Sequence, residues 1–125
     1  MTQCPQTVVL LVEDEPLILM STAQLLEDEG FRVIEATDAE EALTAVEANS
    51  DISVLFTDIN MPGEMDGLDL ARQVHIAHPD IHLILTSGKV SPTKGQLPDD
   101  GCFIGKPYSV AAVARVISSM LHVGP

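Results

Sequence analysis

Five short apolar runs alternate with longer segments of helical periodicity from one end of this chain to the other. The runs cover residues 7–12, 32–36, 52–57, 82–86 and 102–105. They are rich in aliphatic residues, and the first run holds five such residues in succession, which is typical of a strand that helices cover on both faces. The alternation predicts an α/β domain built on a parallel sheet.

Capping residues mark the expected ends of the helices. Asp14 or Glu15 can cap the first helix, and Gly30 can end it. Later helices are expected over residues 39–49 and 67–77 and from residue 110 onwards, with N-caps at Asp38, Asp66 and Ser109.

The helical pattern fails between the fourth and fifth runs. Residues 88–101 contain three glycines and two prolines, which raise the entropic cost of order and remove backbone donors. We therefore expect a shortened or irregular fourth helix there, in a segment more mobile than the rest.

Length and charge narrow the class of protein. The 125 residues are enough for one domain, which we expect over residues 1–125. The net charge of -13, with only six Lys and Arg residues, argues against nucleic acid as a partner. Two distant cysteines and the lack of a long apolar segment predict a cytoplasmic protein with no membrane partner.

Four of the runs end at polar residues of a particular kind. Glu13 and Asp14 follow the first run, Asp58 the third and Lys106 the fifth, and Thr86 closes the fourth. Parallel alignment would gather these side chains at one edge of the sheet, near the topological switch point where ligands bind in such folds.

The three carboxylates of Glu13, Asp14 and Asp58 would repel one another unless a proton or a cation neutralised them. Mg²⁺ suits oxygen ligands of this kind better than zinc does, and the backbone carbonyl of Asn60 could supply another ligand. The sequence therefore predicts a magnesium site.

Asp58 is our candidate nucleophile, because an aspartate can accept a phosphoryl group when a metal and fixed donors hold the developing charge. Lys106 would supply a positive charge to the phosphoryl group. Thr86 would supply a hydroxyl donor.

Taken together, these residues resemble the receiver domain of two-component response regulators over the whole chain. The matching motifs, in the family's order and close to its spacings, are Glu13–Asp14, Asp58, Thr86 and Lys106–Pro107. The resemblance implies a doubly wound, flavodoxin-like sheet of five strands in the order 2-1-3-4-5. It also implies that Asp58 accepts phosphoryl from a sensor histidine kinase and loses it slowly without enzymatic turnover.

The same resemblance bears on switching and on the Lys106–Pro107 bond. It implies that this bond is cis, and it places Phe103 at an aromatic switch position that would respond to movement of Thr86. An ordinary core role for Phe103 is the alternative.

Two departures from the usual receiver pattern point to a subgroup. The loop over residues 58–67 is one residue longer than usual, and the region of the fourth helix is rich in proline. Both features resemble receivers that accompany HWE and related histidine kinases of alphaproteobacteria. We expect a stand-alone receiver, monomeric or weakly dimeric on phosphorylation, whose output is an unknown downstream protein, a phosphotransfer protein or a phosphate sink.

Two other classes of protein share this kind of sheet. A phosphatase of the haloacid dehalogenase type would also use Asp58 as nucleophile, but its second acid is absent from Asp58-Ile59-Asn60 and no cap domain fits the length. A flavodoxin-like cofactor binder would need a phosphate loop after the first strand, which the sequence lacks.

Overall fold

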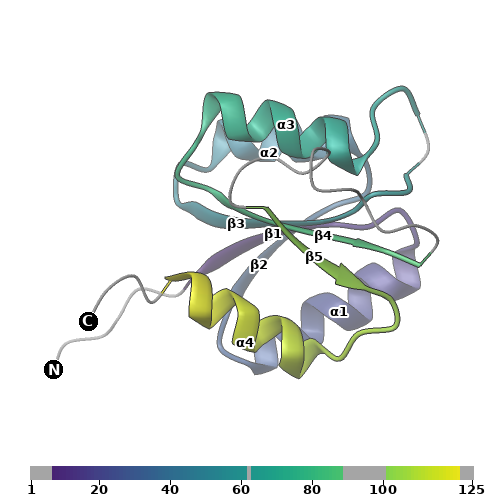
Figure 1. The fold of residues 1–125 in the computed structure, drawn as a ribbon, viewed down its shortest axis with the longest axis vertical. Coiled ribbons are helices and arrows are strands. Elements are labelled where there is room, and N and C mark those ends of the chain that lie inside the picture. Colours follow the sequence, from purple (N-terminus) through teal and green to yellow (C-terminus); the bar gives the residue numbers. More distant parts are fainter. Residues whose placement is uncertain (1–6, 62, 89–100, 122–125) are drawn as a thin grey trace, which may run out of the picture.

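The computed structural model describes residues 7–61, 63–88 and 101–121, and within them it contains one five-stranded sheet (Figure 1). The strands are β1 (Val8–Val12), β2 (Arg32–Ala36), β3 (Ile52–Asp58), β4 (His82–Ser87) and β5 (Gly101–Gly105). Their order is β2-β1-β3-β4-β5, and every neighbouring pair is parallel. The predicted fold class and strand order are confirmed.

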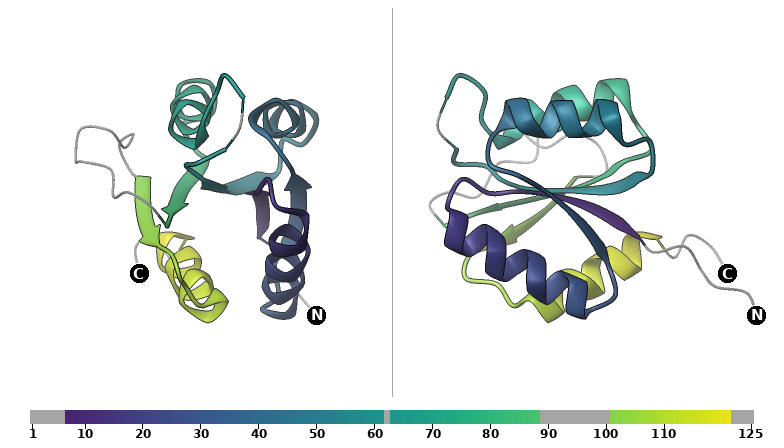
Figure 2. Two further views of the ribbon diagram at one scale, coloured as in Figure 1. Left: turned by 90° about the vertical axis from the view of Figure 1, so that its right-hand side faces the viewer. Right: turned by 180° about the vertical axis from the view of Figure 1, so that it is seen from behind.

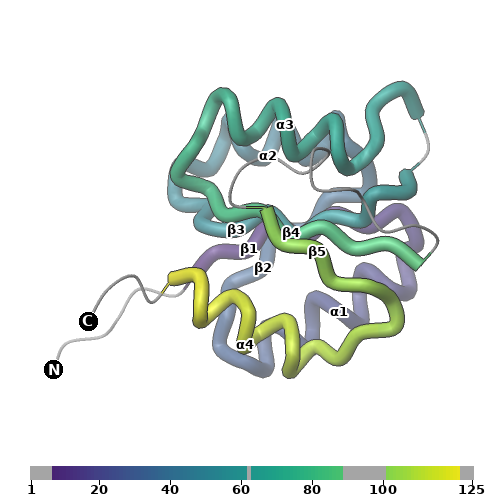
Figure 3. Tube along the Cα trace, in the orientation of Figure 1, coloured from purple at the N-terminus to yellow at the C-terminus, as the bar shows by residue number. Residues whose placement is uncertain are grey.

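Four helices formed by the described residues cover the two faces of this sheet. They are α1 (Pro16–Asp28), α2 (Ala39–Ala48), α3 (Gly67–Ala77) and α4 (Val110–Leu121). Figure 2 shows α2 and α3 on one face and α1 and α4 on the other, and the trace in Figure 3 follows the chain as it winds over each face in turn. Gly88 is the one described residue between β4 and β5, so the expectations of a shortened or irregular fourth helix and of a mobile segment fall on residues 89–100, which lie outside the described residues.

Each face of the sheet has its own hydrophobic core. Along β1, Val8, Leu10 and Val12 pack toward α2 and α3, whereas Val9 and Leu11 pack toward α1 and α4. This alternation explains why the whole strand is apolar, since both of its faces are buried. Complete burial of one such side chain contributes about 1.5–3 kcal/mol.

The strands extend slightly further toward the site than the sequence predicts. Asp58 pairs with Thr86 in the β3–β4 ladder, and Ser87 pairs with Gly105 in the β4–β5 ladder. Asp58 and Ser87 therefore belong to strands rather than to loops, which fixes their backbones.

The first helix begins differently from the prediction. Glu15 occupies the N-cap position of α1, but its side chain makes no capping hydrogen bond, and Asp14 does not cap either. Instead, the Glu15 backbone N–H donates to Oε2 of Glu13 at 3.2 Å. The helix ends as expected: Gly30 has a φ of 101°, and the N–H groups of Gly30 and Phe31 donate to carbonyls of the last turn, as in a Schellman motif.

The three other predicted caps are confirmed. Asp38 accepts a hydrogen bond from the Glu41 N–H at 2.8 Å, and the Ser109 hydroxyl accepts one from the Ala112 N–H at 3.1 Å. Asp66 and Asp69 form a reciprocal capping box. This box sets the start of α3 and therefore the length of the loop that follows Asp58. No helix in the described stretches is long and apolar enough to cross a bilayer.

Candidate phosphoacceptor and metal site

The ends of four strands place the predicted site residues along one edge of the sheet. Glu13 and Asp14 follow β1, Asp58 closes β3, and Lys106 follows β5. Thr86 lies directly beside Asp58 in the paired ladder. The strand order reverses between β1 and β3, so the cluster stands at the switch point where open parallel sheets bind ligands.

Three carboxylates converge at this edge. Glu13, Asp14 and Asp58 each offer an oxygen, and these oxygens lie within 4.8 Å of one another. Glu13 and Asp58 are buried, with exposures of 4% and 6%, while Asp14 is partly exposed. An all-oxygen donor set with one accessible side fits a hard cation such as Mg²⁺, which keeps several of its waters.

Lys106 neutralises part of this charge. Its Nζ donates to Oδ2 of Asp58 at 2.7 Å and lies 3.6 Å from Oε1 of Glu13. The Lys106–Pro107 peptide bond is cis, as expected. The ammonium group thus contacts both buried carboxylates of the cluster.

The pKa values of the site follow from burial and from these contacts. Burial raises the pKa of Glu13 above its ordinary 4.5, and the charge of Asp58 and a hydrogen bond with the Asp14 side chain add to this, although the Glu15 N–H and the charge of Lys106 oppose it. Burial alone would lower the pKa of Lys106, but the hydrogen bond and charge of Asp58, with the charge of Glu13, raise it above 10.5. Lys106 therefore stays charged at neutral pH.

Among the described residues, the hydroxyl group of Thr86 has no hydrogen-bond partner. The residue is 3% exposed, and its Oγ1 makes no hydrogen bond with any described residue. Leaving a buried donor unpaired costs about 1–3 kcal/mol, so an acceptor that arrived beside Asp58 would be stabilised by this group.

Phe103 lies on β5, where it pairs with Leu85 and packs, partly buried, against the core under α2 and α3. This packing accounts for an apolar residue at the position. Its role as a switch stays a prediction.

Tyr108 covers the other face, beside the start of α4. Its ring meets that of Phe56 edge to face at 5.5 Å. Burial raises the pKa of Tyr108, although a hydrogen bond with Thr22 opposes the shift.

Two residues near Asp58 were missed by the sequence reasoning. The Ser87 hydroxyl donates to Oδ1 of Asn60 at 2.5 Å, and a Cβ added to Gly67 would lie 2.8 Å from the carbonyl carbon of Asp58. The available signals were a second hydroxyl after Thr86 and a glycine in the first turn of a helix, where glycine is unfavourable.

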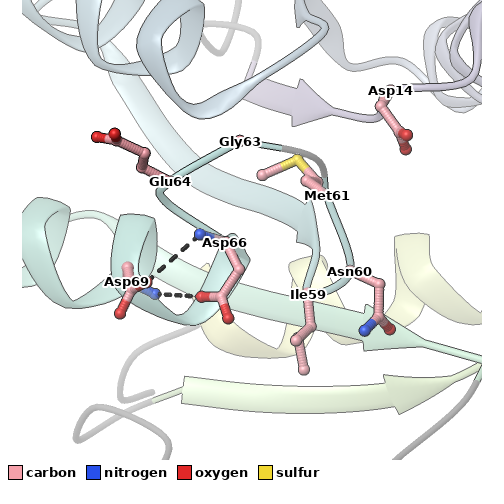
Figure 4. Close-up of a pocket in the computed structure, with 8 residues that line it drawn as sticks. All are labelled: Asp14, Ile59, Asn60, Met61, Gly63, Glu64, Asp66 and Asp69. Atoms are coloured by element: carbon pink, nitrogen blue, oxygen red, sulfur yellow. Dashed lines mark hydrogen bonds between the residues drawn. The ribbon is translucent and has the colours of Figure 1, made fainter.

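An open pocket of about 510 Å³ adjoins the carboxylate cluster at Asp14 (Figure 4). Asp14 and Asn60 lie on its rim, Met61 and Glu64 lie along the loop, and the Asp66 capping box closes the other side. Its polar lining is mostly acidic, so the pocket suits a cation or its hydration water better than an anion.

Comparisons with known proteins agree with this geometry. Residues 9–116 match the family model of the response regulator receiver domain. Sensor kinase CckA of Brucella abortus is 37% identical over 118 residues, which make up 91% of this chain and 12% of that protein. The C4-dicarboxylate transport transcriptional regulatory protein DctD of Rhizobium meliloti is 36% identical over 114 residues, or 89% of this chain and 24% of that protein.

The crystal structure of the receiver domain from hybrid histidine kinase CckA has a TM-score of 0.79 and 30% identity, and the match covers 92% of this chain and 99% of that one. The chain spans a quarter or less of the length of the two curated relatives. The resemblance inferred from the sequence is confirmed. This chain belongs to the response regulator receiver domain family of two-component systems.

Proposed function

We propose that this chain accepts a phosphoryl group on Asp58 from a sensor histidine kinase. The observation that carries the proposal is the placement of a buried Asp58 between an acidic cluster and the Lys106 ammonium group. In the transfer, the bond from phosphorus to the kinase imidazole nitrogen breaks and a bond to a carboxylate oxygen of Asp58 forms. The imidazole nitrogen then recovers a proton.

The neighbouring side chains have distinct roles in this proposal. Lys106 already donates to Asp58 and would follow the charge to a phosphoryl oxygen. Thr86, with its unpaired hydroxyl, would donate to another phosphoryl oxygen. Movement of Thr86 would then give Phe103 room to turn inward, and phosphorylation would in this way change the surface that a partner protein contacts.

Mg²⁺ would be held by Glu13, Asp14 and Asp58, with the backbone carbonyl of Asn60 as a further ligand. When bound, the ion supplies positive charge that offsets the charge on the phosphoryl oxygens. The convergence of three carboxylate oxygens supports this assignment.

The wider biology is part of the same proposal. We infer a cytoplasmic receiver over residues 1–125 that turns over no substrate. A kinase of the HWE type would be the phosphoryl donor, and the output would be a downstream protein, a phosphotransfer protein or a phosphate sink. The protein would be a monomer or a weak dimer that forms on phosphorylation. The unusual length of the loop at residues 58–67 supports the kinase subgroup.

The test is intact-mass measurement after incubation with acetyl phosphate, with and without Mg²⁺. We expect one phosphoryl adduct on the parent protein, none on Asp58→Asn and an undiminished adduct on Asp80→Asn, a matched change at an exposed residue. An adduct that survives Asp58→Asn would refute the assignment. Repeated turnover of a phosphate ester would instead indicate the phosphatase alternative.

A further inference from the structure

A side-chain hydrogen bond ties the end of β4 to the loop that follows β3. The Ser87 hydroxyl donates to Oδ1 of Asn60 at 2.5 Å, across 27 positions of sequence. Ser87 is 3% exposed, whereas Asn60 is exposed to solvent. The bond therefore joins a loop side chain to a buried strand residue.

The backbone of Asn60 is placed to interact with both the Asp58 carboxylate and the proposed Mg²⁺ ion. Its N–H donates to Oδ1 of Asp58 at 2.9 Å, and its carbonyl is the proposed fourth protein ligand of Mg²⁺. Any rotation of the Asn60 backbone would alter the acceptor carboxylate and the metal ligand together.

Strand β4, which contains Ser87, is held on both sides by backbone hydrogen bonds. The Ile59 N–H donates to the carbonyl of Thr86 at 2.8 Å, and the Lys106 N–H donates to the carbonyl of Ser87 at 3.1 Å. The hydrogen bond from Ile59 to β4 joins backbone atoms, so it does not depend on the identity of the side chains. The hydrogen bond from β4 to Asn60, in contrast, needs a side chain with a hydroxyl group at position 87.

We propose that Ser87 is a positioning residue for the site. Its hydroxyl group holds Asn60 in the orientation in which the N–H restrains Asp58 and the carbonyl is available to Mg²⁺. This inference depends on the proposed function for the identity of the cation, while the hydrogen bond belongs to the fold. A neutral hydrogen bond of ordinary strength corresponds to about a two- to tenfold change in Mg²⁺ affinity.

The experiment is an NMR-monitored Mg²⁺ titration of the parent, Ser87→Ala, Asn60→Ala and the double variant. We expect each single change to weaken Mg²⁺ binding about two- to tenfold and the double variant to be no weaker than the single ones. Ser118→Ala, which removes an exposed hydroxyl from α4, is the matched control and should bind as the parent does.

A second readout separates positioning from general damage. Phosphorylation of Ser87→Ala by acetyl phosphate should be slow at low Mg²⁺ and should reach the parent rate at saturating Mg²⁺. A deficit that persists at saturation, additive effects of the two substitutions, or parent affinity in Ser87→Ala would each overturn the proposal.

Failure of this inference can be distinguished from failure of the proposed function. A parent protein that binds Mg²⁺ but forms no adduct refutes phosphoryl acceptance, while the titration still decides the role of Ser87. Asn60→Ala changes an exposed residue and keeps the test decisive if Ser87→Ala does not fold, because unchanged affinity in Asn60→Ala also overturns the proposal.

Discussion

Replacement of Gly67 by alanine should disturb the site through the backbone alone. Gly67 is the first residue of α3, and its N–H donates to the carbonyl of Ile59 at 3.0 Å. A Cβ there would lie 2.8 Å from the carbonyl carbon of Asp58 and from Cα of Ile59, and closer still to the Asp58 carbonyl oxygen. All of these are backbone atoms, so no side-chain rotation relieves the clash.

The magnitude follows from two opposing contributions. Alanine is a better helix former than glycine by about 1 kcal/mol, which would stabilise Gly67→Ala if space allowed. The 2.8 Å contacts fall about 0.6 Å short of the 3.4 Å at which ordinary contact begins, so α3 or the end of β3 must move by at least that amount. Overpacking of this kind costs about 1–3 kcal/mol, and we expect a net loss in that range.

The displacement should also impair Mg²⁺ binding and phosphoryl acceptance, because the backbone atoms that must move include those of Asp58. Functional groups need placement within about 0.5 Å. We therefore expect Gly67→Ala to bind Mg²⁺ more weakly and to accept phosphoryl more slowly than the parent.

Urea unfolding followed by circular dichroism would measure the stability, and the Mg²⁺ titration would measure the site. Gly105→Ala is the matched control, because its Cβ would meet only the Phe103 ring at an ordinary 3.8 Å. If Gly67→Ala matched the parent in both stability and Mg²⁺ affinity, the argument from close backbone approach would be wrong.

Three further predictions concern single side chains. Mg²⁺ at about 100 times its dissociation constant should add about 2.7 kcal/mol to the free energy of unfolding, and Asp14→Asn should remove most of that gain in thermal melts. Thr86→Val should raise the free energy of unfolding by about 1 kcal/mol, because it removes an unpaired buried hydroxyl, yet it should slow phosphorylation; a clear loss of stability would contradict this. Tyr108, the chain's one tyrosine, should ionise above pH 10.0 in an ultraviolet titration. Since its native pKa is raised, the stability it contributes is complete below pH 10.0 and is lost as the pH rises through the native value; ionisation at or below 10.0 would contradict the burial.

The sheet and the position of most of the site residues could be predicted from the sequence, because the end of each strand is visible in the sequence. An apolar run stops where the chain leaves the core, so Asp58 and Lys106 could be placed at one edge before any contact was known. Local signals were equally reliable for Asp38, Asp66 and Ser109, since a cap acts within one turn of its own helix.

The features that were missed depend on how the elements pack together, even where the partners are close in sequence. Asp14 and Glu15 looked like caps, but the Glu15 N–H is instead satisfied by Glu13, which burial holds in place. The partnership of Ser87 with Asn60 and the crowding of Gly67 against Asp58 arise only when β3, β4 and α3 pack together. Periodicity cannot reveal a contact of this kind.

The contact of Lys106 with Glu13 and Asp58 has a consequence for how folding depends on the magnesium concentration in a cell. The ammonium group acts as a built-in counter-ion that offsets part of the charge of the two buried carboxylates without a dissolved metal. We expect the chain to fold whether magnesium is scarce or plentiful. Magnesium supply would then govern how fast the folded protein responds to its kinase rather than how much folded protein there is.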